Sequence, residues 1–397
     1  MTKRMRQGAM AAAAVLLGTA AACAGPGRPA THDRPPHHGP AGTAADGAAR
    51  KGGFTLVATG DVLPHDSVIA QGEADAEGDG YDFAPMFAAV KPVVSGADLA
   101  ICHMETVYGE EGGPYSGYPA FVSPPEIAQG LKDTGYDSCS TASNHSLDDG
   151  ADGVRRTLDA LDKAGVGHAG SARSAAEAMR PALMKAGGAK VAQLAYTFGT
   201  NDAPFPEDQP WAVGLLDEDQ IIADARAARS AGADVVVVSV HWGTEWQTEP
   251  DAEQLELGRK LTASRSGNRP DIDLILGTHA HVPQPYQKVN GTWIIYGMGD
   301  QVAGTMTNDD GELDGRGNHG SIGRFTFAPP AAKGERWQVK KAEFIPQMMD
   351  LDTLRVVHLP DAVQRDPGRD DYREIQSDIS EAVLSRGAAA DGLTMGR

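Results

Sequence analysis

The sequence predicts an α/β fold in which helices alternate with the strands of a layered sheet. Short β-branched and apolar runs recur along the chain, and most are followed by glycine and polar residues, as is typical of buried strands. Segments with helical spacing of apolar residues lie between these runs. Ligands of such sheets bind outside the carboxyl ends of the strands, so the polar residues that follow the runs are the candidate functional residues.

Seven apolar runs are predicted to be strands of this sheet. The run at 235–240 is the clearest, because five valines are interrupted by a single serine. The run at 191–196 carries no reactive side chain at its end, unlike the others. The predicted strands are 54–59, 98–103, 136–141, 191–196, 235–240, 272–276 and 293–296.

Three helices are predicted between these strands. In the first, Val154, Leu158 and Leu161 share one face, and Gly165 ends the helix. The other two span 219–231, which is followed by Gly232, and 251–265.

The chain after about residue 325 has a different pattern. Apolar residues alternate there, which predicts antiparallel strands. A helix over 369–386 and a frayed tail from Gly387 follow. Because no linker precedes it, residues 331–397 are predicted to be a C-terminal extension packed on the main domain, 53–330. The three predicted strands are 325–327, 337–345 and 354–358.

The N-terminus reads as a targeting segment. Basic residues precede an apolar run at 9–17, and small residues precede Cys23, which predicts a secretory signal peptide over 1–23. The end of this segment resembles a bacterial lipobox, with Cys23 as the lipidated residue. Ala20 stands where leucine is commoner, so ordinary cleavage and secretion stay open. Residues 24–52 are rich in Gly, Pro, Ala and His and are predicted to be a disordered linker.

Composition excludes several classes of protein. The chain has 397 residues and a net charge of −19, from 35 basic and 54 acidic side chains. This balance argues against binding nucleic acid or an anionic bilayer surface through charge. Three cysteines are too few for a disulfide-stapled mini-fold. Cys102 and Cys139 lie late in two predicted strands, where they would either pair in an exported protein or remain buried thiols.

The polar residues at the strand ends form a set that suits divalent metals. Carboxylates, an amide and imidazoles are ligands of first-row ions. His279 and His281 alternate in an extended segment, so both imidazoles can face one cavity. Asp61 has a second oxygen with which to bridge two ions ~3.5–4 Å apart. The candidates are Asp61, Glu105, Asn144, His145, His241, His279 and His281.

Each of these residues also has a structural interpretation. Asp61 follows a glycine and could cap a helix or a turn. Asn144 and His145 fit a turn as well, and His241 could be a buried histidine bonded to backbone. Five such motifs, all at strand ends, favour a shared site over five separate structural roles.

The order of the motifs resembles the bacterial capsule-synthesis CapA family, also called poly-γ-glutamate synthesis proteins. The resemblance covers roughly residues 54–304. Its most distinctive segment is Ser143-Asn144-His145-Ser146-Leu147-Asp148-Asp149-Gly150. The other motifs are Gly60-Asp61, Glu105-Thr106, His241-Trp242-Gly243-x-Glu245, Gly277-x-His279-x-His281 and Gly297-Met298-Gly299-Asp300.

This family is similar to calcineurin-like metallophosphatases, so the resemblance implies a four-layer α/β/β/α sandwich with two metal ions (Mn, Zn, Fe or Mg). It implies that Asp61 bridges the ions and that Glu105 bridges them or binds one. The metallophosphatases have a histidine where this chain has Leu63, and His65 is the nearest substitute. The roles implied for the remaining positions are ligands of one ion (Asn144, His241, His279), ligand of the other (His281), proton donor (His145) and substrate wall (Trp242, Glu245).

The expected function follows from the site and the resemblance together. It is an exported metal-dependent hydrolase that cleaves a phosphoester or amide in capsule, poly-γ-glutamate or other envelope polymer metabolism. The lipid on Cys23 would hold it at the outer face of the cell membrane. The alternative is a non-catalytic accessory or polymer-binding component of a capsule synthesis or export assembly.

Overall fold

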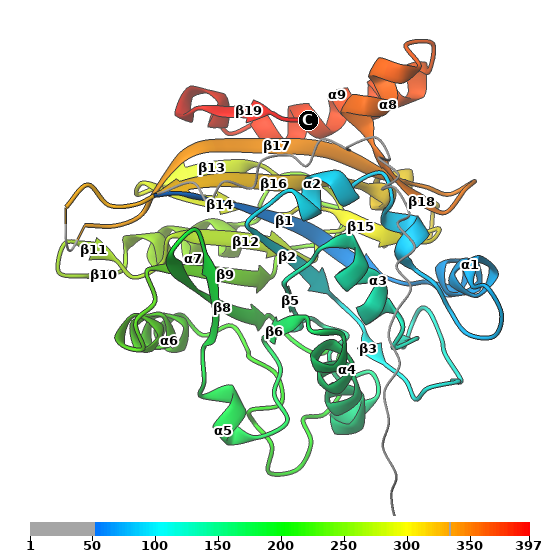
Figure 1. The fold of residues 1–397 in the computed structure, drawn as a ribbon, viewed down its shortest axis with the longest axis horizontal. Coiled ribbons are helices and arrows are strands. Elements are labelled where there is room, and N and C mark those ends of the chain that lie inside the picture. The colour runs from blue at the N-terminus through cyan, green and yellow to red at the C-terminus, as the bar shows by residue number, and fades with distance from the viewer. Residues whose placement is uncertain (1–51, 333–334) are drawn as a thin grey trace, which may run out of the picture. The chain divides into compact units, whose positions relative to one another are not determined.

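The computed structural model describes residues 52–332 and 335–397 (Figure 1). The predicted signal peptide, with Cys23, and residues 24–51 of the predicted linker lie outside the described residues. The described residues belong to one compact unit. Within the described ranges, no helix combines the length and the apolar character needed to cross a membrane.

Two large sheets form the centre of the molecule. The first follows the order β18-β17-β16-β1-β2-β5-β6, with β15 paired to β1 and β19 paired to β17. Its strands are β1 (Phe54–Leu63), β2 (Leu99–Met104), β5 (Ser138–Ser140), β6 (Gly167–Ala169), β15 (Asp300–Ala303), β16 (His319–Ala328), β17 (Gln338–Asp350), β18 (Arg355–His358) and β19 (Leu393–Met395).

The second sheet has the order β13-β14-β12-β9-β8-β7. Its central strands β8, β9, β12 and β14 are parallel neighbours. Its strands are β7 (Ala182–Ala186), β8 (Ala189–Thr197), β9 (Val235–His241), β12 (Leu274–Thr278), β13 (Tyr286–Val289) and β14 (Thr292–Ile295). Two short pairs lie outside both sheets: β3 (Val107–Tyr108) with β4 (Val122–Ser123), and β10 (Arg265–Ser266) with β11 (Arg269–Pro270).

Helices flank the two sheets (Figure 1). Four helices lie between β1 and β6 in the chain: α1 (Asp66–Asp75), α2 (Lys91–Ser95), α3 (Ile127–Thr134) and α4 (Gly150–Ala164). The helices after β6 are α5 (Ala175–Ala178), α6 (Glu218–Ser230), α7 (Ala252–Ala263), α8 (Leu359–Arg365) and α9 (Asp370–Leu384).

Three buried cores separate four layers. Val57 of β1 packs toward Leu131 of α3 and Leu158 of α4. The neighbouring Leu56 points the other way, into a core shared with Val237 of β9, because side chains alternate along a strand. A third core joins the outer face of the second sheet to α6 and α7. The order is therefore α/β/β/α, which confirms the predicted fold.

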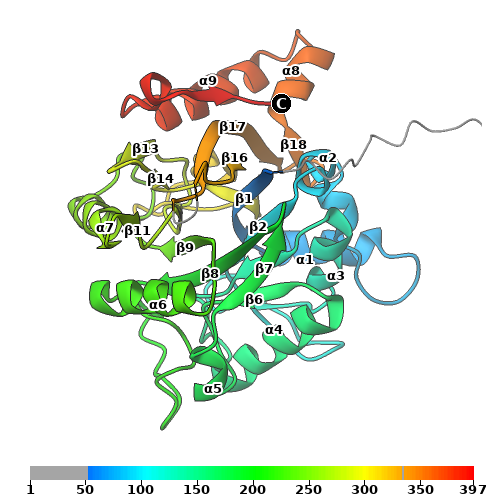
Figure 2. The same cartoon turned by 60° about the vertical axis from the view of Figure 1, so that its left-hand side comes forward.

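The predicted strands and helices are all present, with shifts of a few residues at their ends. The first predicted helix is α4, and Gly165 ends it in the left-handed conformation at φ 74°. Residues 331–397 contribute β17, β18 and β19 to the first sheet, and α8 and α9 lie along this part of it (Figure 2).

The prediction of a frayed tail from Gly387 is wrong. Leu393 is 2% exposed, and its backbone begins β19, which pairs with β17 in parallel. Ala388 is fully buried in the same core. Burial of these side chains offsets the entropy of ordering a Gly- and Ala-rich segment.

The two cysteines form a disulfide between neighbouring strands. Cys102 of β2 and Cys139 of β5 are direct partners in a parallel ladder, and their sulfurs are bonded. The structure therefore favours the first of the two possibilities left open by the sequence. Cys102 precedes His103, and Cys139 precedes Ser140, whose Oγ lies 2.8 Å from His103 Nδ1, so the cross-link fixes the relative position of β2 and β5 beside this pair.

Candidate metal centre

A cluster of polar side chains, here called the polar cluster, lies where the parallel strands of both sheets end. Its members are Asp61, His103, Glu105, His241, Glu245, His279, His281 and Asp300. β1, β2 and β5 run parallel in the first sheet, as do β9 and β12 in the second. Asp61 is placed by a close approach of two backbones: a Cβ on Gly60 would lie 1.7 Å from the carbonyl oxygen of Gly299. The amide of Asp61 donates to that same oxygen at 3.1 Å. A glycine at position 60 is therefore required for Asp61 to face the space between the sheets.

Three groups of side chains bring possible ligand atoms within 4.8 Å of one another. Asp61 belongs to two of them. Its Oδ1 lies 3.9 Å from His103 Nε2, and its Oδ2 lies 3.8 Å from His281 Nδ1. The groups are Asp61 with His103 and His241, Asp61 with Glu105 and His281, and Glu245 with His279 and His281.

Several buried atoms of this cluster have no hydrogen-bond partner. They include both carboxylate oxygens of Glu105, which is 1% exposed. An unpaired buried polar group is costly, and a native fold rarely leaves several together without a ligand. The donor set of carboxylate oxygens and imidazole nitrogens suits a divalent cation. The unpartnered atoms are Asp61 Oδ1, His103 Nε2, Glu105 Oε1 and Oε2, His279 Nδ1 and Asp300 Oδ2.

Neighbouring polar groups hold the imidazoles in position. His103 Nδ1 lies 2.8 Å from Ser140 Oγ. His241 Nδ1 lies 3.0 Å from Thr278 Oγ1, and its Nε2 lies 2.9 Å from Asn144 Oδ1. Bonds of this kind fix the ring orientation and tautomer of metal-binding histidines.

Burial raises the pKa values of the carboxyl groups in the cluster and lowers those of most of its imidazoles. Burial, followed by repulsion from Asp300, raises the pKa of Asp61 well above its usual range. Burial lowers the pKa of His103 to about 3. Burial alone would lower the pKa of His281 too, but Asp300, 2.9 Å away, and Glu105 raise it. Attraction to His281 lowers the pKa values of Asp61, Glu105 and Asp300 but does not offset their burial, and a bound cation would supply further positive charge.

His145 lies beside the three groups but belongs to none of them. Its Nδ1 lies 2.7 Å from Asp148 Oδ2, three residues further along the chain. Its other ring nitrogen, Nε2, lies 3.5 Å from Asn201 Nδ2. The preceding residue, Asn144, has its Oδ1 2.9 Å from His241 Nε2. His145 is therefore positioned next to the candidate ligands, with one ring nitrogen held by a carboxylate.

Two residues of the predicted site, His65 and Trp242, are not among the candidate ligand groups of the described residues. His65 Nδ1 lies 3.0 Å from the carbonyl oxygen of Leu63 and 3.0 Å from the amide of Gly304, and His65 is in none of the ligand groups found among the described residues. Trp242 is 2% exposed, and its Nε1 donates to the carbonyl oxygen of Tyr296 in the outer core. Trp242 therefore cannot form a substrate wall, which corrects that prediction. Glu245 does face the cluster, 4.0 Å from His279 Nε2.

Two residues of the cluster were absent from the predicted set. His103 precedes Glu105 by two positions at the end of a strand, so period-two alternation places both on one face. Asp300 begins β15 directly after the Gly297-Met298-Gly299 segment, and it is in register with Asp61 across the β1–β15 pair. The strand-end pattern that identified Asp61 applies to both residues.

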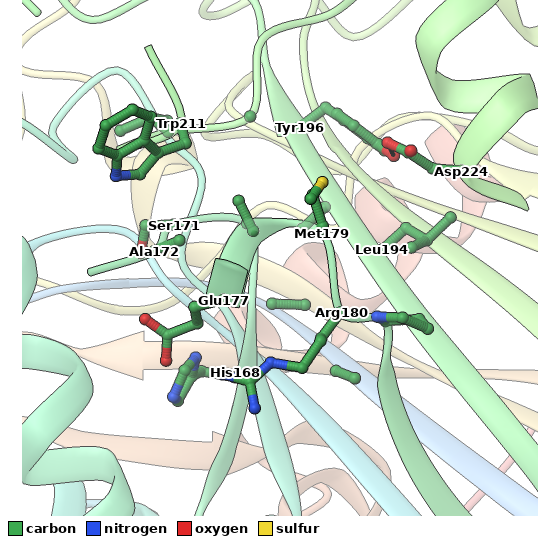
Figure 3. Close-up of a pocket in the computed structure, with 18 of the residues that line it drawn as sticks. His168, Ser171, Ala172, Glu177, Met179, Arg180, Leu194, Tyr196, Trp211 and Asp224 are labelled. Carbon is green, nitrogen blue, oxygen red and sulfur yellow. Dashed lines mark hydrogen bonds between the residues drawn. The ribbon is translucent and has the colours of Figure 1, made fainter. Parts of the chain in front are cut away.

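A separate cavity of about 1050 Å³ lies between α5, β8 and α6 (Figure 3). Its lining includes His168, Met179 and Trp211 and none of the ligand groups described above. Arg173, also in its lining, pairs with Glu177 at 2.5 Å. This cavity is therefore distinct from the candidate metal centre.

Comparison with known proteins places the chain in a family. PGA biosynthesis protein CapA of Bacillus subtilis (strain 168) is 28% identical over 208 residues, which cover 51% of this chain and 53% of that protein. Capsule biosynthesis protein CapA of Bacillus anthracis is 26% identical over 180 residues, 45% of this chain and 42% of that protein. The chain spans about half the length of these relatives.

A solved structure, that of a 5′-nucleotidase precursor from Thermus thermophilus, superposes with a TM-score of 0.42 at 15% identity, over 79% of this chain and 59% of that one. The family model described as bacterial capsule synthesis protein PGA_cap matches residues 55–305, more than half of the chain. This chain therefore belongs to the bacterial capsule synthesis protein PGA_cap family.

Proposed function

We propose that this protein is a metal-dependent hydrolase that cleaves a phosphoester or amide bond in the metabolism of a capsule, of poly-γ-glutamate or of another envelope polymer. The observation that carries the proposal is the convergence of unpartnered carboxylate and imidazole atoms at the strand ends of both sheets. A cluster of this composition has a clear use as a cation site and is costly without one.

The residues that would hold the ions are those of the three groups, together with Asp300 and Asn144. We propose two ions, because Asp61 belongs to two of the groups and offers one oxygen to each. The N and O donors fit Mn, Zn, Fe or Mg. A divalent ion bound here would lower the pKa of a coordinated water toward ~7 and so provide a nucleophile at neutral pH.

His145 is the proposed proton donor to the leaving group. Asp148 holds its Nδ1, which fixes the ring and leaves Nε2 on the side of Asn201. A carboxylate in this position keeps an imidazole in one tautomer and one orientation. His145 would therefore act beside the ions without binding one.

The proposed setting is the outer face of the cell membrane, with a lipid on Cys23, or the secreted state if the N-terminal segment is cleaved without lipidation. The buried Cys102–Cys139 disulfide supports export, since disulfides persist in oxidising compartments. The names of the two CapA relatives, which refer to capsule and PGA biosynthesis, support an envelope polymer pathway.

A second candidate is a non-catalytic accessory or polymer-binding component of a capsule synthesis or export assembly. Two observations favour it. His65, the proposed substitute for the histidine that Leu63 replaces, bonds to backbone and stays outside the ligand groups of the described residues. A Mycobacterium tuberculosis relative, 26% identical over 238 residues, is named as a probable polyglutamine synthesis accessory protein. The cavity beside Trp211 would then be a candidate binding surface.

Metal content and turnover together separate the two candidates. The purified protein is loaded with Mn²⁺ or Zn²⁺ and desalted, and its metal is counted by mass spectrometry. It is then assayed on a phosphomonoester, a phosphodiester and a γ-glutamyl amide. The hydrolase predicts about two ions per chain and turnover that Asp61→Ala abolishes. His168→Ala, which removes an imidazole outside the cluster, is the control and should change neither the metal content nor the turnover. Bound metal without turnover of any substrate would favour the accessory role.

A further inference from the structure

Three arginines gather at the end of the second sheet opposite the candidate metal centre. Arg229 lies in the last turn of α6, Arg269 in β11 and Arg336 two residues before β17, and together they are here called the arginine cluster. The nearby acids Asp234 and Asp273 directly precede β9 and β12, which end at the candidate metal centre. β9 has 7 residues, so its two ends lie about 20 Å apart. The arginine cluster is therefore separate from the candidate metal ligands.

The three guanidinium groups converge because they share acceptors. Arg229 Nη2 contacts Asp273 Oδ2, and Arg336 Nε lies 3.7 Å from Oδ1 of the same carboxylate. Arg229 Nη1 lies 3.4 Å from the carbonyl oxygen of Ala233, and Arg269 Nη2 lies 3.5 Å from that same oxygen. Arg229 therefore shares one acceptor with each of the other two arginines, and three positive charges meet at one place.

One carboxylate contacts these three cations. Asp273 is fully buried, and within the described ranges no other carboxylate oxygen lies within 4.0 Å of the arginine cluster. The Nε atoms of Arg229 and Arg269 are buried without a hydrogen-bond partner. Burial, followed by repulsion from Arg229, lowers the pKa of Arg269, yet a guanidinium stays charged at neutral pH. The cluster thus lacks both negative charge and hydrogen-bond acceptors, and an oxyanion supplies both.

A purely structural role accounts for only part of the cluster. The Arg229–Asp273 pair is sufficient to tie α6 to the start of β12, whereas two further arginines add repulsion. These two can be reached from solvent: the Arg336 side chain is 19% exposed, and Arg269 is half-buried. Among the described residues, Arg269 Nη1 and both terminal nitrogens of Arg336 make no hydrogen bond. These nitrogens are the donors available to a ligand.

We propose that the arginine cluster binds an oxyanion, either a carboxylate or a phosphate, at the amino ends of β9 and β12. The planar guanidinium matches both groups, because two of its N–H donors can meet two oxygens at once. The chain as a whole carries a net charge of −19 and repels anions, so a local excess of arginines determines where an anion binds. This site goes beyond the proposed hydrolase and does not depend on it. The anion comes from a free small ion or from a charged group of an envelope polymer.

Calorimetric titration at low ionic strength tests the proposal. Inorganic phosphate and a decamer of glutamate are titrated separately into the purified protein. We expect Arg269→Gln and Arg336→Gln each to weaken binding about tenfold or more, because each removes a charged donor. Arg336→Lys keeps the charge and should weaken binding less. Arg155→Gln is the matched control and should have no effect, because Arg155 is an exposed arginine on α4.

The two probes also separate the sources of the anion. Decamer binding that is much tighter than phosphate binding, and that both glutamine variants weaken, would support a polymer. Phosphate binding that is at least as tight, with the same loss in the variants, would support a free ion. Circular dichroism and Tm confirm that each variant is folded, and Arg336→Gln decides the test if Arg269→Gln is not. Binding of neither probe, or equal binding in wild type and a folded variant, would overturn the proposal.

Discussion

Replacing Glu105 with glutamine should stabilise the metal-free protein and weaken the metal-loaded one. Glu105 is 1% exposed, and neither of its carboxylate oxygens has a hydrogen-bond partner. His241 Nε2 lies 3.7 Å from its Oε1, and among the charged groups nearby Asp61 and Asp300 raise its pKa whereas His281 lowers it. Without a cation, folding must bury this carboxylate among other acids. Burial, followed by repulsion from Asp61, therefore raises its pKa well above 4.5.

The size of the effect follows from the cost of an unpaired buried group. Leaving a buried polar or charged group without a partner costs about 1–3 kcal/mol. In a chain of this length that corresponds to about 1–6 °C in Tm. Glu105→Gln should therefore raise the Tm of the chelated protein by this amount at pH 8, because the amide carries no charge.

The direction in which the pKa of Glu105 is shifted determines how the stability of the fold changes with pH. A carboxyl whose pKa is higher in the folded state costs nothing below its unfolded pKa and destabilises the fold increasingly as the pH rises above it. The stability gain of Glu105→Gln should thus shrink as the pH falls from 8 toward 4.5, the ordinary pKa of this group.

Thermal unfolding with and without excess EDTA, at several pH values, measures these effects. In Mn²⁺ the order should reverse, since the variant loses an anionic ligand and with it part of the stabilisation that binding provides. A variant that is less stable than wild type in EDTA, or a difference that does not change with pH, would refute the placement of Glu105 as an unpaired buried carboxylate.

Three further predictions concern the groups around the site. Replacing both Cys102 and Cys139 with alanine removes a cross-link between residues 37 positions apart, so it should lower the free energy of unfolding by about 3–4 kcal/mol. Urea unfolding measures this loss, and an unchanged midpoint would argue against the disulfide. Asp148→Asn should reduce kcat about tenfold or more at unchanged metal content, because His145 loses the carboxylate that orients it. Equal kcat in the variant and the wild type would exclude His145 as the proton donor. Gly60→Ala should abolish metal binding, because the added Cβ would clash with the carbonyl oxygen of Gly299. Gly315→Ala is the control and should have no effect, because the space around Gly315 is open. Full metal occupancy in Gly60→Ala would contradict the close approach of the two backbones.

The strands were predictable because buried parallel strands are continuous apolar runs. The five valines of 235–240 form β9, in the centre of the second sheet. Strand order was not predictable from periodicity, because an apolar run does not specify its neighbour. The division into two sheets came only from the family resemblance. The ordered tail was missed for a similar reason: one leucine, Leu393, has no local pattern, and only its contact with β17 makes it part of the core.

The strand-end pattern located the site, although His279 and His281 adopt the left-handed conformation at φ 92° and 57° and not the extended one that was expected. Residues were misplaced or missed where side-chain alternation within a strand was not applied. His241 and Trp242 are consecutive, so they point to opposite sides, and the tryptophan enters the outer core. His103 lies within an apolar run and was counted as part of the strand, although it alternates with Glu105. The position of His65 depends on the turn after β1, which no sequence period describes.

The central claim is that residues from both sheets converge to bind divalent cations, and anomalous diffraction from crystals of the Mn²⁺-loaded protein tests it most directly. We expect anomalous density in the space bounded by Asp61, His103 and His241 and in that bounded by Asp61, Glu105 and His281. Crystals grown at saturating Mn²⁺ that show no density in either space would contradict the claim.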